Sequence, residues 1–265
     1  MFDSMKFWTV LTRLAGILVL LFLLLPLFAI IPLAFNAGSI VSYPMTGLST
    51  RWFEAVVSTP RWLNSIGNSM IVAAATVALS VPLGTAAALG LDRLHFAGKS
   101  VVMAILISPM IVPVIITAVG VYFFFAPMGL ANSLLGLILA HSAIAVPYVL
   151  VSVNAVASQR DRRLERAGSS LGATPFVVFR TITMPLILPG IVSGAIFAFA
   201  ASFDEVVIAM MITGPDQKTL PRELLSGTRE NLDPSVLAVA TIIIAISAGL
   251  LVALNLVGAK RKVAG

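Results

Sequence analysis

Hydrophobic residues fill the chain in long runs that charged residues interrupt only at intervals. Six stretches carry no charged side chain, and the longest lies between Lys99 and Arg160. A membrane-spanning helix needs roughly 20 consecutive apolar residues, so this longest stretch can hold two, with a natural break at Pro127-Met128-Gly129. The pattern therefore predicts about six spanning helices, near residues 14–35, 65–91, 101–125, 131–156, 186–212 and 235–257.

Composition supports the same fold class. Of the 265 residues, 59% are hydrophobic and 11% are charged, whereas a soluble domain is about 25% charged. Lipid must cover part of so much apolar surface, and the spans leave no block of residues for a second domain. We therefore expect an all-α membrane protein with one transmembrane domain over 1–265. The absence of cysteine excludes disulfides, thiolate metal sites and cysteine nucleophiles.

The placement of basic residues predicts the orientation. Five lie in the loops around 36–63 and 213–233, namely Arg51, Arg61, Lys218, Arg222 and Arg229. The other twelve lie at the termini or in the segments 92–100 and 157–185, namely Lys6, Arg13, Arg93, Lys99, Arg160, Arg162, Arg163, Arg166, Arg180, Lys260, Arg261 and Lys262. By the positive-inside rule both termini face the cytoplasm. The net charge of +6 then reflects membrane orientation, and no nucleic-acid partner is expected.

The predicted cytoplasmic segment 157–185 contains two short helices. One runs from about Arg162 to Leu171 and stops at Gly172, a residue suited to a helix C-terminus. The second begins with Thr174 as N-cap and Pro175 in the first helical position. Such a short pair is not stable alone in water, so it needs a surface on which to dock.

The spacing in this segment resembles the cytoplasmic EAA loop of binding-protein-dependent ABC importer permeases. That family's pattern is Glu-Ala-Ala, three residues, Gly, nine residues, Ile, any residue, Leu, Pro. The chain keeps Ala167, Gly172, Ile182 and Pro185, and it departs from the pattern at Arg166, Gly168 and Met184. Glu165, one position early, is a candidate replacement for the missing acid.

The resemblance implies a type I importer permease fold (MetI-like), in which this loop is a coupling helix seated on an ATPase subunit. The candidate coupling residues are Glu165, Arg166, Ala167, Gly168, Leu171, Gly172, Ile182 and Pro185. The alternative is an amphipathic helix held on the membrane surface by its arginines and anionic lipid. The helix stop at Gly172 and the start at Thr174-Pro175 favour docking on a protein.

Three further segments resemble the polyamine (spermidine and putrescine) permeases, namely Ala201–Val206, Thr219–Leu224 and Asp233–Ser235. The resemblance implies a bacterial inner-membrane importer with a second permease subunit, two ATPase subunits and a periplasmic substrate-binding protein that meets the loops 36–63 and 213–233. Related permeases carry ferric ion, opines or amino-acid derivatives, so these solutes stay open as alternatives.

The chain itself is not expected to be an enzyme or to bind a cofactor or metal. Gly98-Lys99-Ser100 looks like the end of a phosphate-binding loop, but the first glycine of that motif falls on Arg93. ATP and Mg²⁺ therefore belong on the partner ATPase. A self-sufficient secondary transporter remains a rival, although neither inverted repeats nor charged midplane residues are evident. A membrane-embedded enzyme is disfavoured because His141 and Ser142 are consecutive and point apart on a helix.

Five residues inside the predicted spans are candidates for the substrate path. Asp204 and Glu205 lie in the outer half of the fifth span, where ionisable residues are costly and usually face a cavity or a partner. Either carboxylate is a candidate ligand for a cation, with Phe203 placed for a cation–π contact. His141 and Tyr148 share one face of the fourth span, although a hydrogen bond to a neighbouring helix explains a buried histidine equally well.

Overall fold

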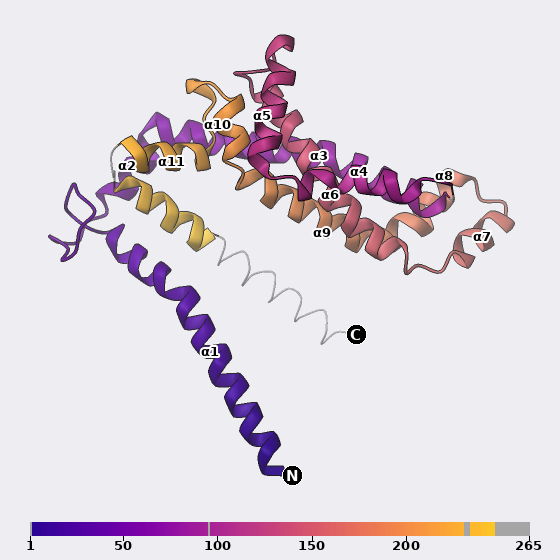
Figure 1. The fold of residues 1–265 in the computed structure, drawn as a ribbon, viewed down its shortest axis with the longest axis horizontal. Coiled ribbons are helices and arrows are strands. Elements are labelled where there is room, and N and C mark those ends of the chain that lie inside the picture. Colours follow the sequence, from indigo (N-terminus) through magenta and orange to yellow (C-terminus); the bar gives the residue numbers. More distant parts are fainter. Residues whose placement is uncertain (1, 95, 231–233, 247–265) are drawn as a thin grey trace. The chain divides into compact units, whose positions relative to one another are not determined.

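The computed structural model describes residues 2–94, 96–230 and 234–246, and all regular elements within these ranges are helices (Figure 1). The all-α prediction is confirmed. The chain divides into two compact units, one formed by residues 1–63 and 224–265 and the other by residues 64–223. The expectation of a single transmembrane domain stays a prediction.

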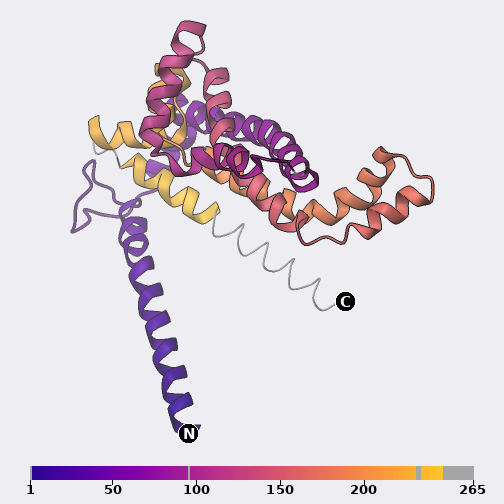
Figure 2. The same ribbon diagram turned by 45° about the vertical axis from the view of Figure 1, so that its right-hand side comes forward.

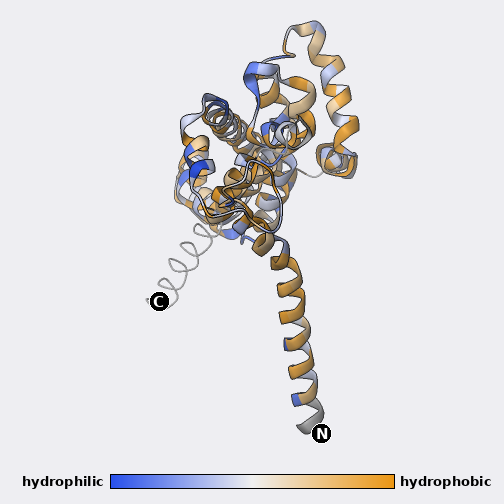
Figure 3. Cartoon of the chain, turned by 90° about the vertical axis from the view of Figure 1, so that its left-hand side faces the viewer, coloured by the Kyte–Doolittle hydropathy of each residue, from blue (hydrophilic) through white to orange (hydrophobic). Residues whose placement is uncertain are grey.

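The first unit begins with the long helix α1 (Phe2–Leu33). Hydrophobic residues cover this helix on all sides, as Figure 3 shows, and from Lys6 to Leu25 every side chain is exposed. A helix that is apolar all round and not buried by the chain is typical of a lipid-facing span. The unit also contains α2 (Arg51–Ser58), most of α11 (Leu220–Glu230) and a short apolar helix, Ser235–Ile246.

A buried asparagine organises the predicted outward loop between α1 and α2. Asn36 Oδ1 accepts hydrogen bonds from the backbone N–H groups of Gly38 and Thr46, both at 3.1 Å. The indole Nε1 of Trp52 donates to the Asn36 carbonyl at 2.9 Å. These bonds satisfy polar groups that a loop would otherwise leave to water.

Three long helices, α3 (Pro60–Arg93), α6 (Leu134–Ala157) and α9 (Met184–Phe203), supply the centre of the second unit. Figures 1 and 2 show α6 and α9 running side by side. Glycines allow this contact, because a Cβ atom at Gly190 or Gly194 would lie 2.9 Å from the α6 backbone. Small residues four apart are a common means of close helix packing in membranes. The core of this unit therefore includes the close contact between α6 and α9 at these two glycines.

The predicted third span is bent. The helix α4 (Lys99–Ile111) and the following helical segment, made of α5 (Val114–Phe125) and η1 (Ala126–Met128), form a pair bent by 102°. The break falls at Val112-Pro113, because a residue before proline disfavours helical geometry and proline lacks an N–H donor. A single span near 101–125 was expected, and the structure divides it into two helical segments at this bend.

The predicted fifth span differs at both ends. The helix already begins at Pro175, continues as α8 (Pro175–Val178) and the π-helical turn η2 (Phe179–Thr183), and joins α9. The resulting span, Pro175–Phe203, ends nine residues before the expected end at residue 212. Residues 207–212 form a separate helix, α10 (Val207–Ile212). The predicted loop 157–185 is accordingly shorter, because its last eleven residues are helical.

Four helices in the described ranges are long and apolar enough to cross a membrane, or five if the bent pair is one span. The predicted sixth span, 235–257, extends outside the described residues, which end with the helix Ser235–Ile246. Lys260, Arg261 and Lys262 also lie outside them. The exact count of six and the cytoplasmic position of both termini stay predictions.

Candidate functional site

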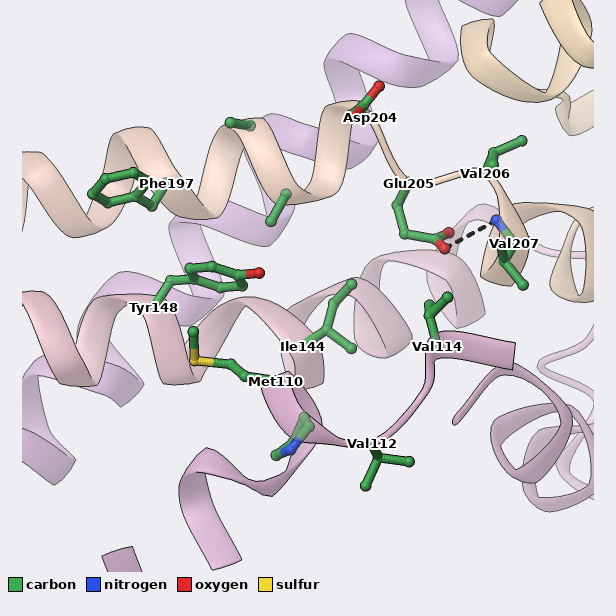
Figure 4. Close-up of a pocket in the computed structure, with 13 residues that line it drawn as sticks. Met110, Val112, Val114, Ile144, Tyr148, Phe197, Asp204, Glu205, Val206 and Val207 are labelled. Atoms are coloured by element: carbon green, nitrogen blue, oxygen red, sulfur yellow. Dashed lines mark hydrogen bonds between the residues drawn. The ribbon is translucent and has the colours of Figure 1, made fainter. Parts of the chain in front are cut away.

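Glu205 lies in the break between α9, which ends at Phe203, and α10, which begins at Val207. Its carboxylate accepts hydrogen bonds from the backbone N–H groups of Val207, Ile208 and Ala209, at distances of 2.9 to 3.2 Å. These are the first N–H groups of α10, which have no partner within the helix. A carboxylate in this position also meets the positive end of the helix dipole. The span breaks between Phe203 and Val207 because this side chain caps α10 (Figure 4).

The same carboxylate belongs to a buried polar network. Nε2 of His141, on α6, lies 3.4 Å from Glu205 Oε2, an ion-pair distance without the geometry of a good hydrogen bond. The other ring nitrogen, Nδ1, lies 2.9 Å from Ser202 Oγ on α9, and Ser202 donates to Thr76 Oγ1 on α3 at 3.4 Å. His141 is fully buried. The hydrogen bond expected between His141 and a neighbouring helix is therefore present.

A cavity of about 660 Å³ lies between the bent pair α4–α5 and the broken span α9–α10. The bend between α4 and α5 contributes Met110, Val112 and Val114, and the break after α9 contributes residues 204–207. Tyr148 of α6 and Phe197 of α9 add two aromatic rings, with the Tyr148 hydroxyl turned toward the space between the helices (Figure 4). The walls are mostly apolar, with few polar groups, a composition typical of small-molecule sites.

Asp204 differs from its neighbour in every contact. Its carboxylate is exposed and makes no hydrogen bond or ion pair with any residue that the structure describes. It sits at the C-terminal end of α9, where the last carbonyl groups lack helical partners and the dipole is negative. A free carboxylate beside a helix C-terminus attracts a cation, so Asp204 is the candidate ligand and Glu205 is a structural cap.

Phe203 does not line this cavity. It stacks on Phe199, with ring centroids 5.6 Å apart and planes 13° apart. The aromatic partners that the structure brings to the cavity are Tyr148, which was predicted, and Phe197, which was not. Phe197 precedes Phe199 by two residues and Phe203 by six within an uncharged run, so nothing in the sequence distinguishes it from a lipid-facing residue.

The predicted cytoplasmic hairpin is formed by α7 (Arg163–Ser170) and α8. The helix stops at Gly172, whose φ of 84° lies in the left-handed region that favours glycine. Helix α8 begins at Pro175 as predicted, although the Thr174 side chain makes no capping hydrogen bond. A Cβ atom at Gly168 would lie 2.8 Å from Ile182 Cδ1. The glycine at this motif position therefore lets α7 lie close against η2.

Glu165 fixes the base of the hairpin. Its Oε1 accepts hydrogen bonds from Arg160 Nε at 3.0 Å and from Thr183 Oγ1 at 2.8 Å, and its Oε2 lies 3.3 Å from Arg93 Nη2. Burial by itself would raise the pKa of this carboxyl, but the Thr183 hydroxyl and the two guanidinium groups outweigh it and lower the pKa below the ordinary 4.5. Glu165 is therefore an ionised anchor that points into the protein.

A buried aspartate extends this cluster to the end of α3. Asp92 Oδ2 lies 2.8 Å from Arg160 Nη1, and Asp92 Oδ1 lies 2.7 Å from Arg162 Nη2. The Arg160 side chain is only 2% exposed. Asp92, Arg160 and Thr183 were not predicted, because in the sequence they look like ordinary polar residues at the ends of spans.

Several apolar side chains of the hairpin are exposed among its polar ones. Leu171 is 89% exposed, and Phe176 and Leu164 are also exposed. Arg166, Ala167 and Pro185 are exposed as well, whereas Ile182 is half-buried behind Gly168. The predicted coupling residues thus divide into an anchoring set, with Glu165, Gly168 and Ile182, and a set on the surface, with Arg166, Ala167, Leu171, Gly172 and Pro185.

The described residues combine several apolar spans, a cavity between two broken helices and a helical hairpin between spans. These are features of a membrane transport permease. The chain belongs to the family of binding-protein-dependent transport system inner membrane components, whose model matches residues 80–263. It is therefore a multi-pass inner-membrane permease of the ABC importer class and not an enzyme.

Its relatives include the putrescine transport system permease protein PotI of Escherichia coli (strain K12), which is 33% identical over 230 residues, covering 84% of this chain and 82% of PotI. The spermidine/putrescine transport system permease protein PotC of Haemophilus influenzae is 30% identical over 241 residues, covering 91% and 93% of the two chains. The fold is similar to a chain in the crystal structure of a bacterial alginate ABC transporter in complex with an alginate pentasaccharide-bound periplasmic protein. The TM-score is 0.73 at 15% identity, with 95% and 94% of the chains covered.

Proposed function

We propose that this permease translocates a small polyamine, such as putrescine or spermidine, that a periplasmic binding protein delivers. The observation that carries the proposal is the free carboxylate of Asp204 at the cavity between α4–α5 and α9–α10. The aliphatic segments of a polyamine suit the apolar walls, and an ammonium group suits Asp204, the end of α9 and the aromatic faces of Tyr148 and Phe197. The names of the relatives PotI and PotC support the same substrate class.

Uptake into vesicles tests the substrate class. The permease would be reconstituted with its second permease, ATPase and binding protein, and uptake of labelled putrescine would be compared between wild type and Asp204→Asn. Hydrogen bonds to charged groups contribute about 1.5–3 kcal/mol, so we expect uptake efficiency to fall at least about tenfold.

The charge-retaining variant Asp204→Glu is the matched control and should recover most of the uptake. Equal uptake by Asp204→Asn and wild type would remove Asp204 from the substrate path. Uptake of ferric ion or an opine in place of putrescine would leave the permease assignment standing and replace the polyamine.

The partners follow from the same proposal. The hairpin α7–α8 docks on an ATPase subunit through its exposed apolar surface, Leu164, Leu171 and Phe176. Because Glu165 ties α7 to the end of α6 and to η2, movement of the docked hairpin is passed to α6 and α9 together. In the working complex, a second permease and two ATPase subunits complete an alternating-access transporter, with ATP and Mg²⁺ on the ATPase.

Co-purification in mild detergent tests the docking. Leu171→Asp places a charge on the most exposed apolar residue of the hairpin and should reduce recovery of the ATPase at least about tenfold, as expected for an interface anchor. The control is Val57→Asp, at an exposed apolar residue of α2 on the predicted opposite side of the membrane. Unchanged ATPase recovery with Leu171→Asp would refute docking through this surface.

A further inference from the structure

A second cavity, of about 750 Å³, lies between the end of α3 and the α7–α8 hairpin. Its lining includes the side chains of Arg93, Arg162 and Arg166 and two serines of α7. One carboxylate, Glu165, shares the lining, so the charges of the cavity wall sum to a net positive value. The cavity is separate from the one that holds Asp204.

The arginines of this cavity have hydrogen-bond donors to spare. Arg93 donates to Glu165 through its Nη2 only. Arg162 donates through its own Nη2 to both the carbonyl oxygen and the Oδ1 of Asp92, so its other nitrogens are not used in these bonds. The Arg166 side chain has no hydrogen bond or ion pair with the residues that the structure describes. Each guanidinium carries five N–H donors, so most of them remain available for a ligand.

The only carboxylate in the lining is already engaged elsewhere. Glu165 is held on its inner side by Arg160 and Thr183, which lie outside the cavity lining. Arg160 also pairs with Asp92, so the lining and these two residues together hold four arginines against two carboxylates and keep a net positive charge. A planar guanidinium group can donate two parallel N–H bonds to two oxygens of one phosphate. The hydroxyls of the two serines can donate further hydrogen bonds to phosphate oxygens.

The cavity lies at the level where spans end. Arg93 is the last residue of the span Pro60–Arg93, and Pro175, which also lines the cavity, is the first residue of the span Pro175–Phe203. Leu94 and Phe96 follow Arg93 and are exposed. Basic groups at the ends of spans, beside exposed apolar residues, face the phosphate layer of the membrane.

We propose that this cavity binds the phosphate group of an anionic phospholipid. The three arginines hold the phosphate, while Leu94 and Phe96 lie against the acyl chains next to it. A bound lipid would rest between the end of α3 and the hairpin, and so between a span and the element proposed to contact the ATPase. The proposal is independent of the transported solute.

Native mass spectrometry of the full chain tests the proposal. Wild type, Arg166→Gln and the double variant Arg93→Gln/Arg166→Gln would be released from micelles that contain equal amounts of phosphatidylglycerol and phosphatidylcholine. Wild type should retain phosphatidylglycerol preferentially. Each arginine near anionic lipid contributes on the order of 1 kcal/mol, so retention should fall about fivefold for each arginine removed.

The control is Arg163→Gln, which removes the same charge from α7 at an exposed residue outside the cavity, and it should retain lipid as wild type does. Arg166 has no described partner, so its substitution leaves the fold intact. Equal retention of the two lipids, or an equal loss with Arg163→Gln, would overturn the proposal. Displacement of the lipid by millimolar inorganic phosphate, with phosphate bound in its place, would make this a site for free phosphate. Loss of ATPase binding with unchanged lipid retention in Arg166→Gln would assign the arginines to a protein partner instead.

Discussion

Two adjacent acids, Asp204 and Glu205, have opposite environments although they are chemically similar. Glu205 is 9% exposed and its carboxylate faces three backbone N–H groups and His141. Asp204 is exposed at the cavity and has no partner among the described residues. The longer glutamate side chain can fold back onto the N-terminus of α10, and this leaves the aspartate free.

This difference predicts unequal effects of the two alanine variants on stability. Glu205→Ala removes the cap of α10 and leaves His141 buried without its carboxylate, so it should lower the free energy of unfolding by about 1–3 kcal/mol. Asp204→Ala should change it by less than about 0.5 kcal/mol, as for exposed residues in general. Thermal unfolding of the purified variants in one detergent measures both, and equal shifts would contradict the capping role.

At the scale of the elements, the hairpin depends on close contact between α7 and η2. Gly168 permits this contact because its missing Cβ leaves room for the end of Ile182. A methyl group added at residue 168 would clash with Cδ1 of Ile182, which is the mobile end of that side chain. Alanine is therefore tolerated at this position, whereas a large side chain is not.

Gly168→Leu should therefore detach α7 locally, at a cost of about 1–3 kcal/mol for overpacking, while Gly168→Ala should cost much less. Hydrogen exchange of the amides in 163–171 should become at least about tenfold faster in the leucine variant. The alanine variant serves as the matched control. Slow exchange in both would show that the Gly168–Ile182 contact does not hold the helix.

At the scale of the whole molecule, basic residues predict which side each loop faces. The anchoring cluster around Asp92, Arg160 and Glu165 and the arginines of the second cavity all belong to loops that carry the majority of the basic residues. The orientation therefore decides whether the hairpin can meet a cytoplasmic ATPase at all.

Because the sequence has no cysteine, single cysteines report this orientation directly. Ser158→Cys, at the end of α6, and Asp216→Cys, in the exposed turn η3 (Pro215–Gln217), place thiols in opposite loops. In intact spheroplasts a membrane-impermeant maleimide should label Asp216→Cys, whereas Ser158→Cys should react only after permeabilisation. The reverse pattern would invert the topology and exclude the proposed ATPase contact.

The sequence by itself determined the fold class, most of the spans and the hairpin. These features follow from local rules, since a run of apolar residues must be covered by lipid and Gly172, Thr174 and Pro175 bias the backbone at their own positions. The motif spacing of the hairpin depends on the same local order, and the family match covers it.

Only the tertiary structure decided which polar groups meet. Thr76, His141 and Ser202 lie on three helices, and Asp92 and Arg160 come from the ends of two, so their contacts depend on how the helices pack. The break after Phe203 was also not predicted, because apolar residues flank Asp204 and Glu205 and the interruption depends on the Glu205 side chain, which folds back onto the next helix. That packing gives the Glu205 carboxylate its hydrogen bonds and leaves the Asp204 carboxylate without a partner among the described residues. Two neighbouring acids in a sequence do not show which of them will be bound in this way.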